Sequence, residues 1–379
     1  MTPSTPRLLW LLALANFVIG MGAFVVVGVL SPVAQAFGVD RAHAGALMGV
    51  YAATYAVASP LLVAATGRLD RRWLLCIGLV LFALGALAAA LAPSFELLLA
   101  ARALMALGGG IVTPVAASVG VVLAGPGQQG RALSIVFGGL TLAQVLGVPA
   151  GAWLGYAFGW PAAFGVVAVL SLLGLAAIAL ALPVGIAVPV ASLASLGAVL
   201  RSGRLMLAVA FTSLFMGALY VCYTFLAPLL ETLYGLGRDG VTGMLLLFGL
   251  GAVIGNAMGG RLTDHIGAQR TLVLLCLAQA VLMPALTLPT WPLAALGALI
   301  LVWSVFGWSF MVPQQARLAA LDPARLPVLF ALNASAIYVG ATLGSGVGGA
   351  VLKGFGLHAL GLFGAALALV GLASLAFRR

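Results

Sequence analysis

The chain has 379 residues, of which 64% are hydrophobic and 6% are charged, and its mean hydropathy is +1.24. A soluble domain with so few polar residues could not cover its own surface, so this composition excludes a water-soluble globular protein and predicts a protein in a lipid bilayer. The formal net charge of +10 comes from basic residues scattered between apolar runs. That pattern orients a membrane protein, and it argues against nucleic acid as a partner.

Twelve apolar segments are long enough to span about 30 Å of hydrocarbon, which takes roughly 20 helical residues each. The first could be read as a signal peptide, because Arg7 precedes it and Ala34-Gln35-Ala36 resembles a cleavage site. Its apolar run is too long for that, so we expect a mature helix. The predicted spans are 8–30, 44–65, 73–92, 96–122, 131–155, 161–182, 204–228, 241–260, 271–289, 292–315, 328–352 and 357–377.

The basic residues between these spans predict the orientation. With both termini in the cytoplasm, three basic residues lie outside, namely Arg41, Arg238 and Lys353. The cytoplasmic side then holds thirteen arginines, which is the bias that fixes topology. They are Arg7, Arg68, Arg71, Arg72, Arg131, Arg201, Arg204, Arg261, Arg270, Arg317, Arg325, Arg378 and Arg379.

The longest connection, 183–203, contains a weakly amphipathic ASLASLGAVLRS run and predicts a cytoplasmic linker between two six-helix halves, 1–182 and 204–379. The halves read as repeats at an offset of 197 residues, as expected of many transporters. The matching pairs are Thr66 with Thr263, Pro126 with Pro323, Gly147 with Gly344, Gly151 with Gly348 and Gly159 with Gly356.

The segment from Phe137 to Gly159 has glycines at 147, 151, 155 and 159, and Pro149 lies among them. A four-residue spacing places these glycines on one helix face, where another backbone can approach closely. We interpret the segment as a hinge against a partner helix, and the eighth span is the partner we consider. The alternative is a packing helix with no role in transport.

The connection between the eighth and ninth spans contains regularly placed glycine, leucine and aspartate residues that match a known motif. Gly260-Arg261-Leu262-Thr263-Asp264-His265-Ile266-Gly267, between the eighth and ninth spans, fits the G-x-L-x-D-x-x-G loop motif of the major facilitator superfamily. The resemblance covers the whole chain. It implies an all-α fold of twelve transmembrane helices in two pseudo-symmetric six-helix bundles.

The same resemblance implies a conformational latch in that loop, formed by Gly260, Asp264 and Gly267. In the first half the motif is degenerate, since its aspartate position falls on Gly67 and Asp70 comes three residues later. The alternative is that the arginines here only hold topology, because exposed ion pairs contribute little. The candidates in the first half are Arg68, Asp70, Arg71 and Arg72.

The run Gly147-Val148-Pro149-Ala150-Gly151 resembles the G-V-P-x-G motif of the drug:proton antiporter branch. This implies a secondary active transporter that exports drug- or sugar-like small molecules, with protons as the coupling ion. A monomer in the bacterial cytoplasmic (inner) membrane is expected, with no cofactor and no enzymatic activity. The three cysteines have no C-x-x-C spacing, so no metal site is indicated.

Arg102 lies six residues beyond Glu96, about 9 Å deeper in the fourth span. It matches the arginine of the family's R-x-x-x-G motif, although Met105 and Ala106 replace the usual glutamine and glycine. A buried charge is costly unless it faces a cavity or a partner, so we expect a cavity-facing side chain. The alternative is an arginine that reaches back to the interface.

The family resemblance implies a substrate cavity between the halves, lined mainly by the first, fourth, seventh and tenth spans, with the second, fifth, eighth and eleventh beside them. For the aromatic candidates the alternative is lipid contact or packing, and for the amides it is an interhelical hydrogen bond. The candidates are Asn16, Tyr51, Tyr55, Arg102, Met105, Gln144, Phe215, Met216, Tyr220, Tyr223, Asn256, Trp303, Phe306, Asn333 and Tyr338.

No acidic residue is predicted at mid-membrane, because all seven lie in loops or at helix ends. Glu96 and Glu231 are therefore the remaining candidates for proton coupling. The lack of a membrane carboxylate favours the alternative function, a facilitator or importer of a sugar or metabolite without proton coupling. A membrane enzyme or receptor is disfavoured, because the chain has no H-E-x-x-H or G-x-S-x-G motif.

Overall fold

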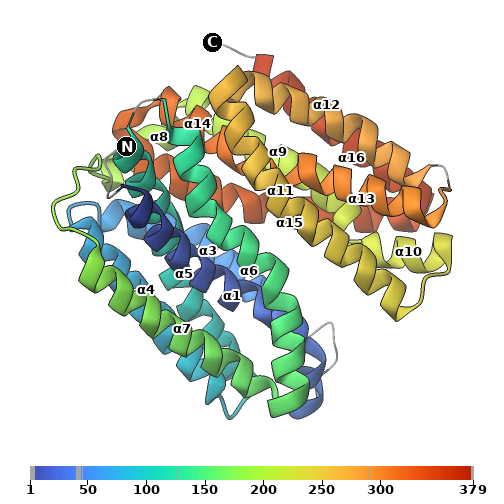
Figure 1. Ribbon diagram of the computed structural model, residues 1–379, viewed down its shortest axis with the longest axis horizontal. Helices are drawn as coiled ribbons and strands as arrows, with labels where there is room; N and C mark the ends of the chain where they lie inside the picture. The colour runs from blue at the N-terminus through green and yellow to red at the C-terminus, as the bar shows by residue number, and fades with distance from the viewer. Residues whose placement is uncertain (1–4, 40–43, 45, 126, 289, 377–379) are drawn as a thin grey trace. The chain divides into compact units, whose positions relative to one another are not determined.

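The computed structural model describes residues 5–39, 44, 46–125, 127–288 and 290–376, and every regular element in these ranges is helical. Twelve segments are long and apolar enough to cross a membrane. The predicted all-α polytopic fold is therefore confirmed. In Figure 1 the α-helices are α1 (Thr5–Phe37), α3 (Ala46–Ala65), α4 (Arg71–Ala90), α5 (Phe95–Ala124), α6 (Gln129–Phe158), α7 (Trp160–Ala181), α8 (Leu193–Arg201), α9 (Gly203–Tyr223), α10 (Leu226–Tyr234), α11 (Arg238–Ile266), α12 (Ala268–Thr287), α13 (Leu293–Trp308), α14 (Met311–Leu321), α15 (Leu326–Phe355) and α16 (Leu360–Ala376).

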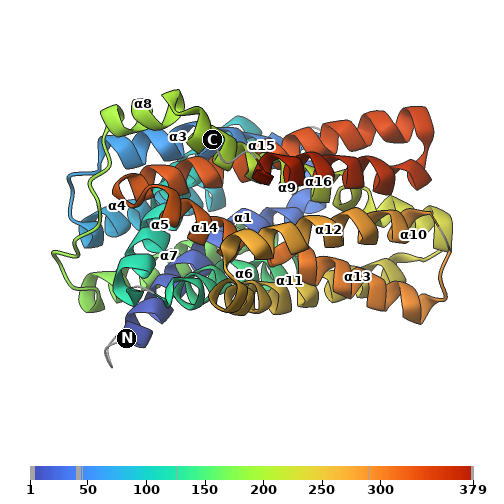
Figure 2. The same ribbon diagram turned by 90° about the horizontal axis from the view of Figure 1, so that it is seen from above.

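The chain divides into two compact units. Unit 1 comprises Met1–Val199 and Asp322–Ser335, and unit 2 comprises Leu200–Leu321 and Ala336–Arg379. In unit 1, α1 packs along α6, and α4 packs against α5 and α7. In unit 2, α12 lies beside α16, as Figure 1 and Figure 2 both show, and α11 packs against α13.

The glycine face of α6 is covered by α1. A methyl group built on Gly151 would overlap the carbonyl oxygen of Val25, and one on Gly147 would lie 3.0 Å from Cβ of Phe24. The two backbones therefore touch where the sequence predicts close approach. The partner is the first span, so the eighth span that we considered is not the helix that covers this face. Pro149 belongs to α6, but its side chain is outside the described part of the structure.

Unit 2 repeats this arrangement with α15 on α9. A methyl group on Gly344 would overlap the carbonyl oxygen of Gly217, and one on Gly348 would lie 2.8 Å from that of Val221. Gly344 and Gly348 are the residues that the 197-residue offset pairs with Gly147 and Gly151.

Two further pairs of the repeat have matching geometry. Thr66 donates its hydroxyl to the carbonyl of Leu62, and Thr263 donates to that of Gly259, each at 2.6 Å. Gly159 and Gly356 both follow a helix and have positive φ angles of 84° and 79°. Four of the five pairs read from the sequence therefore have matching geometry, and Pro126 of the fifth pair lies outside the described residues.

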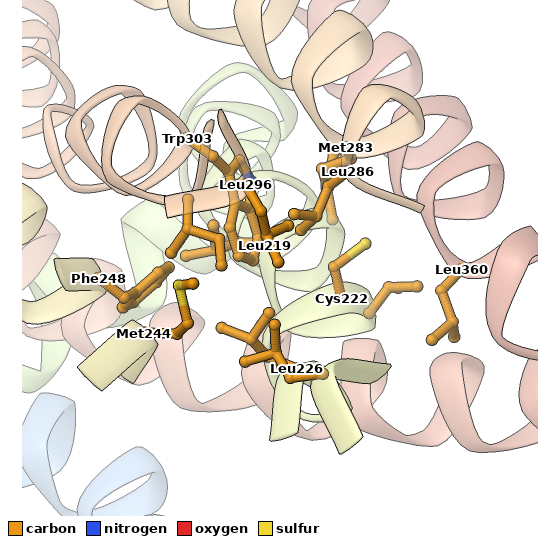
Figure 3. Packing of buried hydrophobic residues seen from close by; sticks show 14 of the residues in the cluster. Leu219, Cys222, Leu226, Met244, Phe248, Met283, Leu286, Leu296, Trp303 and Leu360 are labelled. Carbon is orange, nitrogen blue, oxygen red and sulfur yellow. The ribbon is translucent and has the colours of Figure 1, made fainter. Parts of the chain in front are cut away.

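A dense apolar core fills unit 2 around Trp303 (Figure 3). Phe248 and Met244 of α11 lie on one side of it, and Leu219 of α9 lies beneath it. The indole nitrogen of Trp303 donates to Oε1 of Gln279 at 2.7 Å, so the polar atom of this large side chain is satisfied inside the core.

Three predicted boundaries are wrong. The seventh span ends at Tyr223 and is followed by the separate α10. The tenth span is interrupted after Trp308, where Ser309 donates to the carbonyl of Gly255 at 2.8 Å. The motif that begins at Gly260 is helical rather than a loop, because α11 continues two turns past the apolar run, and Gly267 alone, with φ of 85°, separates it from α12.

Candidate functional site

Arg102 is a fully buried cation in unit 1. The helix that carries it, α5, begins after Ser94, whose hydroxyl accepts the backbone N–H of Leu97 at 3.3 Å. Two turns further on, the Arg102 side chain has an exposed fraction of 0%. The position therefore agrees with a charge facing the interior of the bundle and not with one that reaches the interface.

Backbone carbonyls and an aromatic ring hold the guanidinium group. Nη1 of Arg102 donates to the carbonyl of Gly22 at 2.6 Å, and Nε donates to that of Leu47 at 3.3 Å. The guanidinium carbon lies 4.5 Å from the centre of the Tyr51 ring. A desolvated cation–π contact of this kind contributes up to about 2 kcal/mol, so α1, α3 and α5 converge on one charge.

Four predicted cavity residues gather here. Tyr51 and Tyr55 are one turn apart on α3, with ring centres 6.2 Å apart, and Sδ of Met105 lies 3.9 Å from Nη1 of Arg102. Gly109 makes room for this cluster, because a methyl group there would lie 2.7 Å from the Tyr51 hydroxyl oxygen. The result is a cation bordered by aromatic rings and a thioether, which suits an anionic or strongly dipolar organic group.

Asn16 lies in the contact between α1 and α6. It is fully buried, and Nδ2 donates to the carbonyl of Val136 at 3.1 Å. The interhelical hydrogen bond considered from the sequence is therefore present. Its Oδ1 is buried and has no hydrogen-bond donor among the described residues. Gln144, also predicted for the cavity, is a half-buried residue of α6.

The predicted residues of α9 and α13 form aromatic packing in unit 2. Tyr220 and Tyr223 meet edge to face at 5.6 Å, and Tyr223 stacks on Phe248 at 4.6 Å. Phe248 in turn lies 5.2 Å from Trp303. Trp303 is therefore part of the continuous apolar core.

The remaining candidates are more dispersed. Phe215 is fully buried and stacks on Phe310 at 4.5 Å, and Met216 is also fully buried. Asn256 on α11 is 5% exposed. Phe306 on α13 and Tyr338 on α15 are half-buried. Asn333 is fully buried and belongs to the part of α15 that is grouped with unit 1.

The degenerate first-half motif binds the linker. Asp70 is the N-cap of α4, and the buried Arg71 donates to the carbonyl of Pro189 at 3.1 Å and to that of Gly67 at 3.0 Å. A methyl group on Gly67 would overlap the carbonyl oxygen of Ala191. The loop and the linker are therefore in backbone contact within unit 1.

The other motif residues are more exposed. Arg68 is exposed, and the Arg72 guanidinium lies 5.6 Å from the Trp73 ring centre. In unit 2, Gly260 is buried and Asp264 is exposed in the last turn of α11, one turn before the first residue of α12. A carboxylate at that position is close to the positive end of the α12 dipole.

Three buried glutamines were not singled out from the sequence, and two of them, Gln279 and Gln314, have hydrogen-bond partners that define their roles. Gln279 pairs with Trp303, and Gln314 donates to the carbonyl of Ala208 at 2.8 Å and to the Thr212 hydroxyl at 2.9 Å. The same signal that identified Asn16, an amide inside an apolar span, would have identified both.

Comparison with known proteins agrees with this architecture. A family model described as the Major Facilitator Superfamily matches residues 12–323. The uncharacterized MFS-type transporter YbcL of Bacillus subtilis (strain 168) is 30% identical over 357 residues, 94% of this chain and 92% of the relative. The inner membrane transport protein YdhP of Escherichia coli (strain K12) is 32% identical over 360 residues, again 94% and 92%.

Solved structures share the fold. The crystal structure of the human organic anion transporter MFSD10 (TETRAN) superposes with a TM-score of 0.77 at 19% identity, over 99% of this chain and 100% of that chain. With the family model spanning most of the chain and two relatives at or above 30% identity, the assignment is secure. The chain belongs to the major facilitator superfamily and is a multi-pass membrane transporter.

Proposed function

We propose that this transporter exports small drug- or sugar-like molecules by alternating access, with protons as the coupling ion. The observation that carries the proposal is the buried Arg102, held against Tyr51 by α1 and α5. A charge at this depth is expensive to keep unless it serves the pathway of a substrate or an ion. The site suits a molecule with one polar or anionic group and an apolar body.

The direction of transport rests on the G-V-P-x-G run and on the way it packs. Gly147 and Gly151 bring α6 into backbone contact with α1, the helix that also supplies the Gly22 carbonyl to Arg102. A shift of α6 along this face would therefore move a helix that touches the candidate site. This coupling is what an alternating-access cycle requires.

The protein is proposed to act as a monomer in the bacterial cytoplasmic membrane, with both termini in the cytoplasm. The latch role of Asp264 and the linker contacts of Asp70 and Arg71 belong to the same proposal. Each of these groups lies at a helix end, where its contacts would change if the helices moved between conformations.

A second candidate is a facilitator or importer without proton coupling. It is favoured by the chemistry of the interior, because the buried polar side chains among the described residues are amides, hydroxyls and the arginines 71 and 102, with no carboxylate. A buried carboxylate is the usual group whose raised pKa lets it carry a proton at neutral pH.

Inside-out membrane vesicles distinguish the two candidates. Vesicles containing the protein, and vesicles from cells that lack it, are energised with a proton gradient and exposed to a panel of lipophilic dyes and neutral sugars. Accumulation of a compound that stops when a protonophore collapses the gradient supports proton-coupled export. Equilibration that persists without the gradient selects the facilitator, and identical behaviour of the two vesicle types for every compound contradicts both.

A further inference from the structure

A cationic cavity of about 380 Å³ lies within unit 2, and none of its lining residues belongs to the Arg102 cluster. It is bordered by the first turns of α9 and α12 and by the last turns of α14 and α16. The charge distribution predicts that all four of these helix ends are cytoplasmic. The volume is at the lower end of the roughly 300–1,000 Å³ typical of small-ligand sites.

Two arginines of this cavity have no ion-pair partner among the residues that the structure describes. Neither Arg204 nor Arg317 has a carboxylate within 4.0 Å among the described residues. Arg317 is half-buried, its Nη1 is enclosed without an acceptor in the described part of the chain, and its guanidinium carbon lies 5.5 Å from the Phe211 ring. An arginine that served topology alone would be expected in water, as Arg270 is.

Of the four helix ends at this cavity, the N-termini of α9 and α12 carry positive potential and the C-termini of α14 and α16 carry negative potential, so the net positive charge of the cavity comes from its two arginines. The first residues of α12, Ala268 and Gln269, line it, and the N-cap of that helix is Gly267, which provides no capping side chain. The first backbone N–H groups of a helix and the helix dipole both favour a negative charge. Arg204 is in the first turn of α9, where a cation is unfavourable, so an anion bound beside it would relieve that repulsion as well.

The shape of the site is fixed by neighbouring contacts. Nε2 of Gln269 donates to the carbonyl of Leu375 at 3.0 Å and so joins α12 to α16. Leu207 and Leu375 give the cavity apolar walls next to its two guanidinium groups. This combination matches a phosphate group attached to an apolar body, and it also admits phosphate alone.

We propose that this cavity is a phosphate-binding site, in which Arg204 and Arg317 bind the phosphate and the N-terminus of α12 lies next to it. The ligand is either the phosphate of an anionic phospholipid headgroup or a free phosphate from the cytoplasm. Two guanidinium groups provide paired, charge-assisted hydrogen bonds to phosphate oxygens. The site shares no residue with the Arg102 cluster, so its chemistry does not depend on which compound is carried.

The first arm of the test measures thermal unfolding of the purified, full-length protein in a neutral detergent, with inorganic phosphate titrated against potassium chloride of equal ionic strength. The variants are Arg204→Gln and Arg317→Gln. Arg204 is exposed, so its replacement should preserve folding even if that of Arg317 does not. Arg270→Gln, which removes an arginine from the same turn of α12 but not from the cavity, is the matched control.

The second arm measures thermal unfolding of the wild type and the three variants in nanodiscs of phosphatidylcholine, with or without phosphatidylglycerol. Losing one guanidinium partner should weaken the apparent affinity about tenfold. Stabilisation by phosphate that falls in both cavity variants and survives in Arg270→Gln supports a free-phosphate site. If phosphatidylglycerol stabilises the wild type and Arg270→Gln but not the two cavity variants, and inorganic phosphate has no effect, the site binds a lipid headgroup. Stabilisation by neither, or an equal response of all four proteins, overturns the proposal.

Discussion

The carboxylate of Asp70 joins the start of α4 to a residue 115 positions later in the chain. One oxygen accepts the backbone N–H of Arg72 at 2.9 Å, and the other accepts the backbone N–H of Gly185 at 2.6 Å. Arg71 extends the contact by donating to the carbonyl of Pro189. The acid and the base of the degenerate motif are thus both used to hold the linker on unit 1.

We predict that Asp70→Ala loosens the linker locally. The substitution removes both the N-cap, which contributes about 1 kcal/mol to a helix, and the bond to Gly185. Amide exchange over residues 185–191 should rise roughly fivefold, because one net hydrogen bond of about 1 kcal/mol is lost. Hydrogen exchange followed by mass spectrometry measures this directly.

Ser94→Ala is the matched control for that variant. It also removes an N-cap, that of α5, but in the described structure the Ser94 hydroxyl accepts the N–H of Leu97 and makes no bond to the linker. Exchange over 185–191 should therefore remain at the wild-type rate in the control. Equal exchange in the wild type and in Asp70→Ala would show that the linker is held by other contacts.

The glycine face of α6 shows what the sequence could and could not predict. The four-residue spacing of Gly147, Gly151 and Gly155 correctly predicted a face for close helix packing, because that depends only on helical geometry. The spacing carries no information about the partner, and the helix that covers it is α1. Partner choice depends on contacts between segments that are distant in the sequence.

The candidate site was predictable to a similar extent. A lone arginine inside an apolar span predicted the burial of Arg102, and Tyr51 was placed on a neighbouring helix. The acceptors of Arg102 are the backbone carbonyls of Gly22 and Leu47, which no side-chain pattern reveals. The end of α11 was missed because a helix can continue past the hydrocarbon region once its residues turn polar.

We predict that Gly151→Leu impairs transport without preventing insertion. A side chain at this position meets the carbonyl of Val25, and overpacking of this kind costs about 1 to 3 kcal/mol in the state where the helices are in contact. The conformational equilibrium should shift about tenfold for each 1.4 kcal/mol, so the transport rate should fall while binding survives in one orientation.

Gly165→Leu is the control for the hinge, because Gly165 of α7 faces open space. It should transport at the wild-type rate in the same vesicles. If Gly151→Leu also transports at the wild-type rate, the contact between α6 and α1 does not change during the transport cycle.

Asp264→Asn should slow turnover more than it lowers substrate affinity. If Asp264, in the last turn of α11, acts as the proposed latch, its loss shifts the equilibrium between conformations and leaves binding contacts elsewhere untouched. Steady-state transport gives kcat and KM, and His265→Asn, one residue away and also exposed, is the control. An unchanged kcat would remove the latch role.

The proposed topology predicts which cysteines can be labelled in intact cells. Ala194→Cys on α8 should resist a membrane-impermeant maleimide until the membrane is opened, and Pro93→Cys, between α4 and α5, should react at once. Both positions are exposed. The native Cys76, Cys222 and Cys276 are buried and set a low background. Reaction of Ala194→Cys from outside would invert the assignment.

The most direct test of the transport site is the comparison of Arg102→Gln with Arg131→Gln in proteoliposomes, using a compound identified in the vesicle panel. Arg102 is fully buried and bonded to α1 and α3, whereas Arg131 is exposed in the first turn of α6. Loss of charge-assisted bonds of about 1.5 to 3 kcal/mol should lower kcat/KM at least tenfold in Arg102→Gln, and Arg131→Gln should stay within about twofold of the wild type. A folded Arg102→Gln protein that binds and transports the compound as the wild type does would show that Arg102 is not part of the transport site.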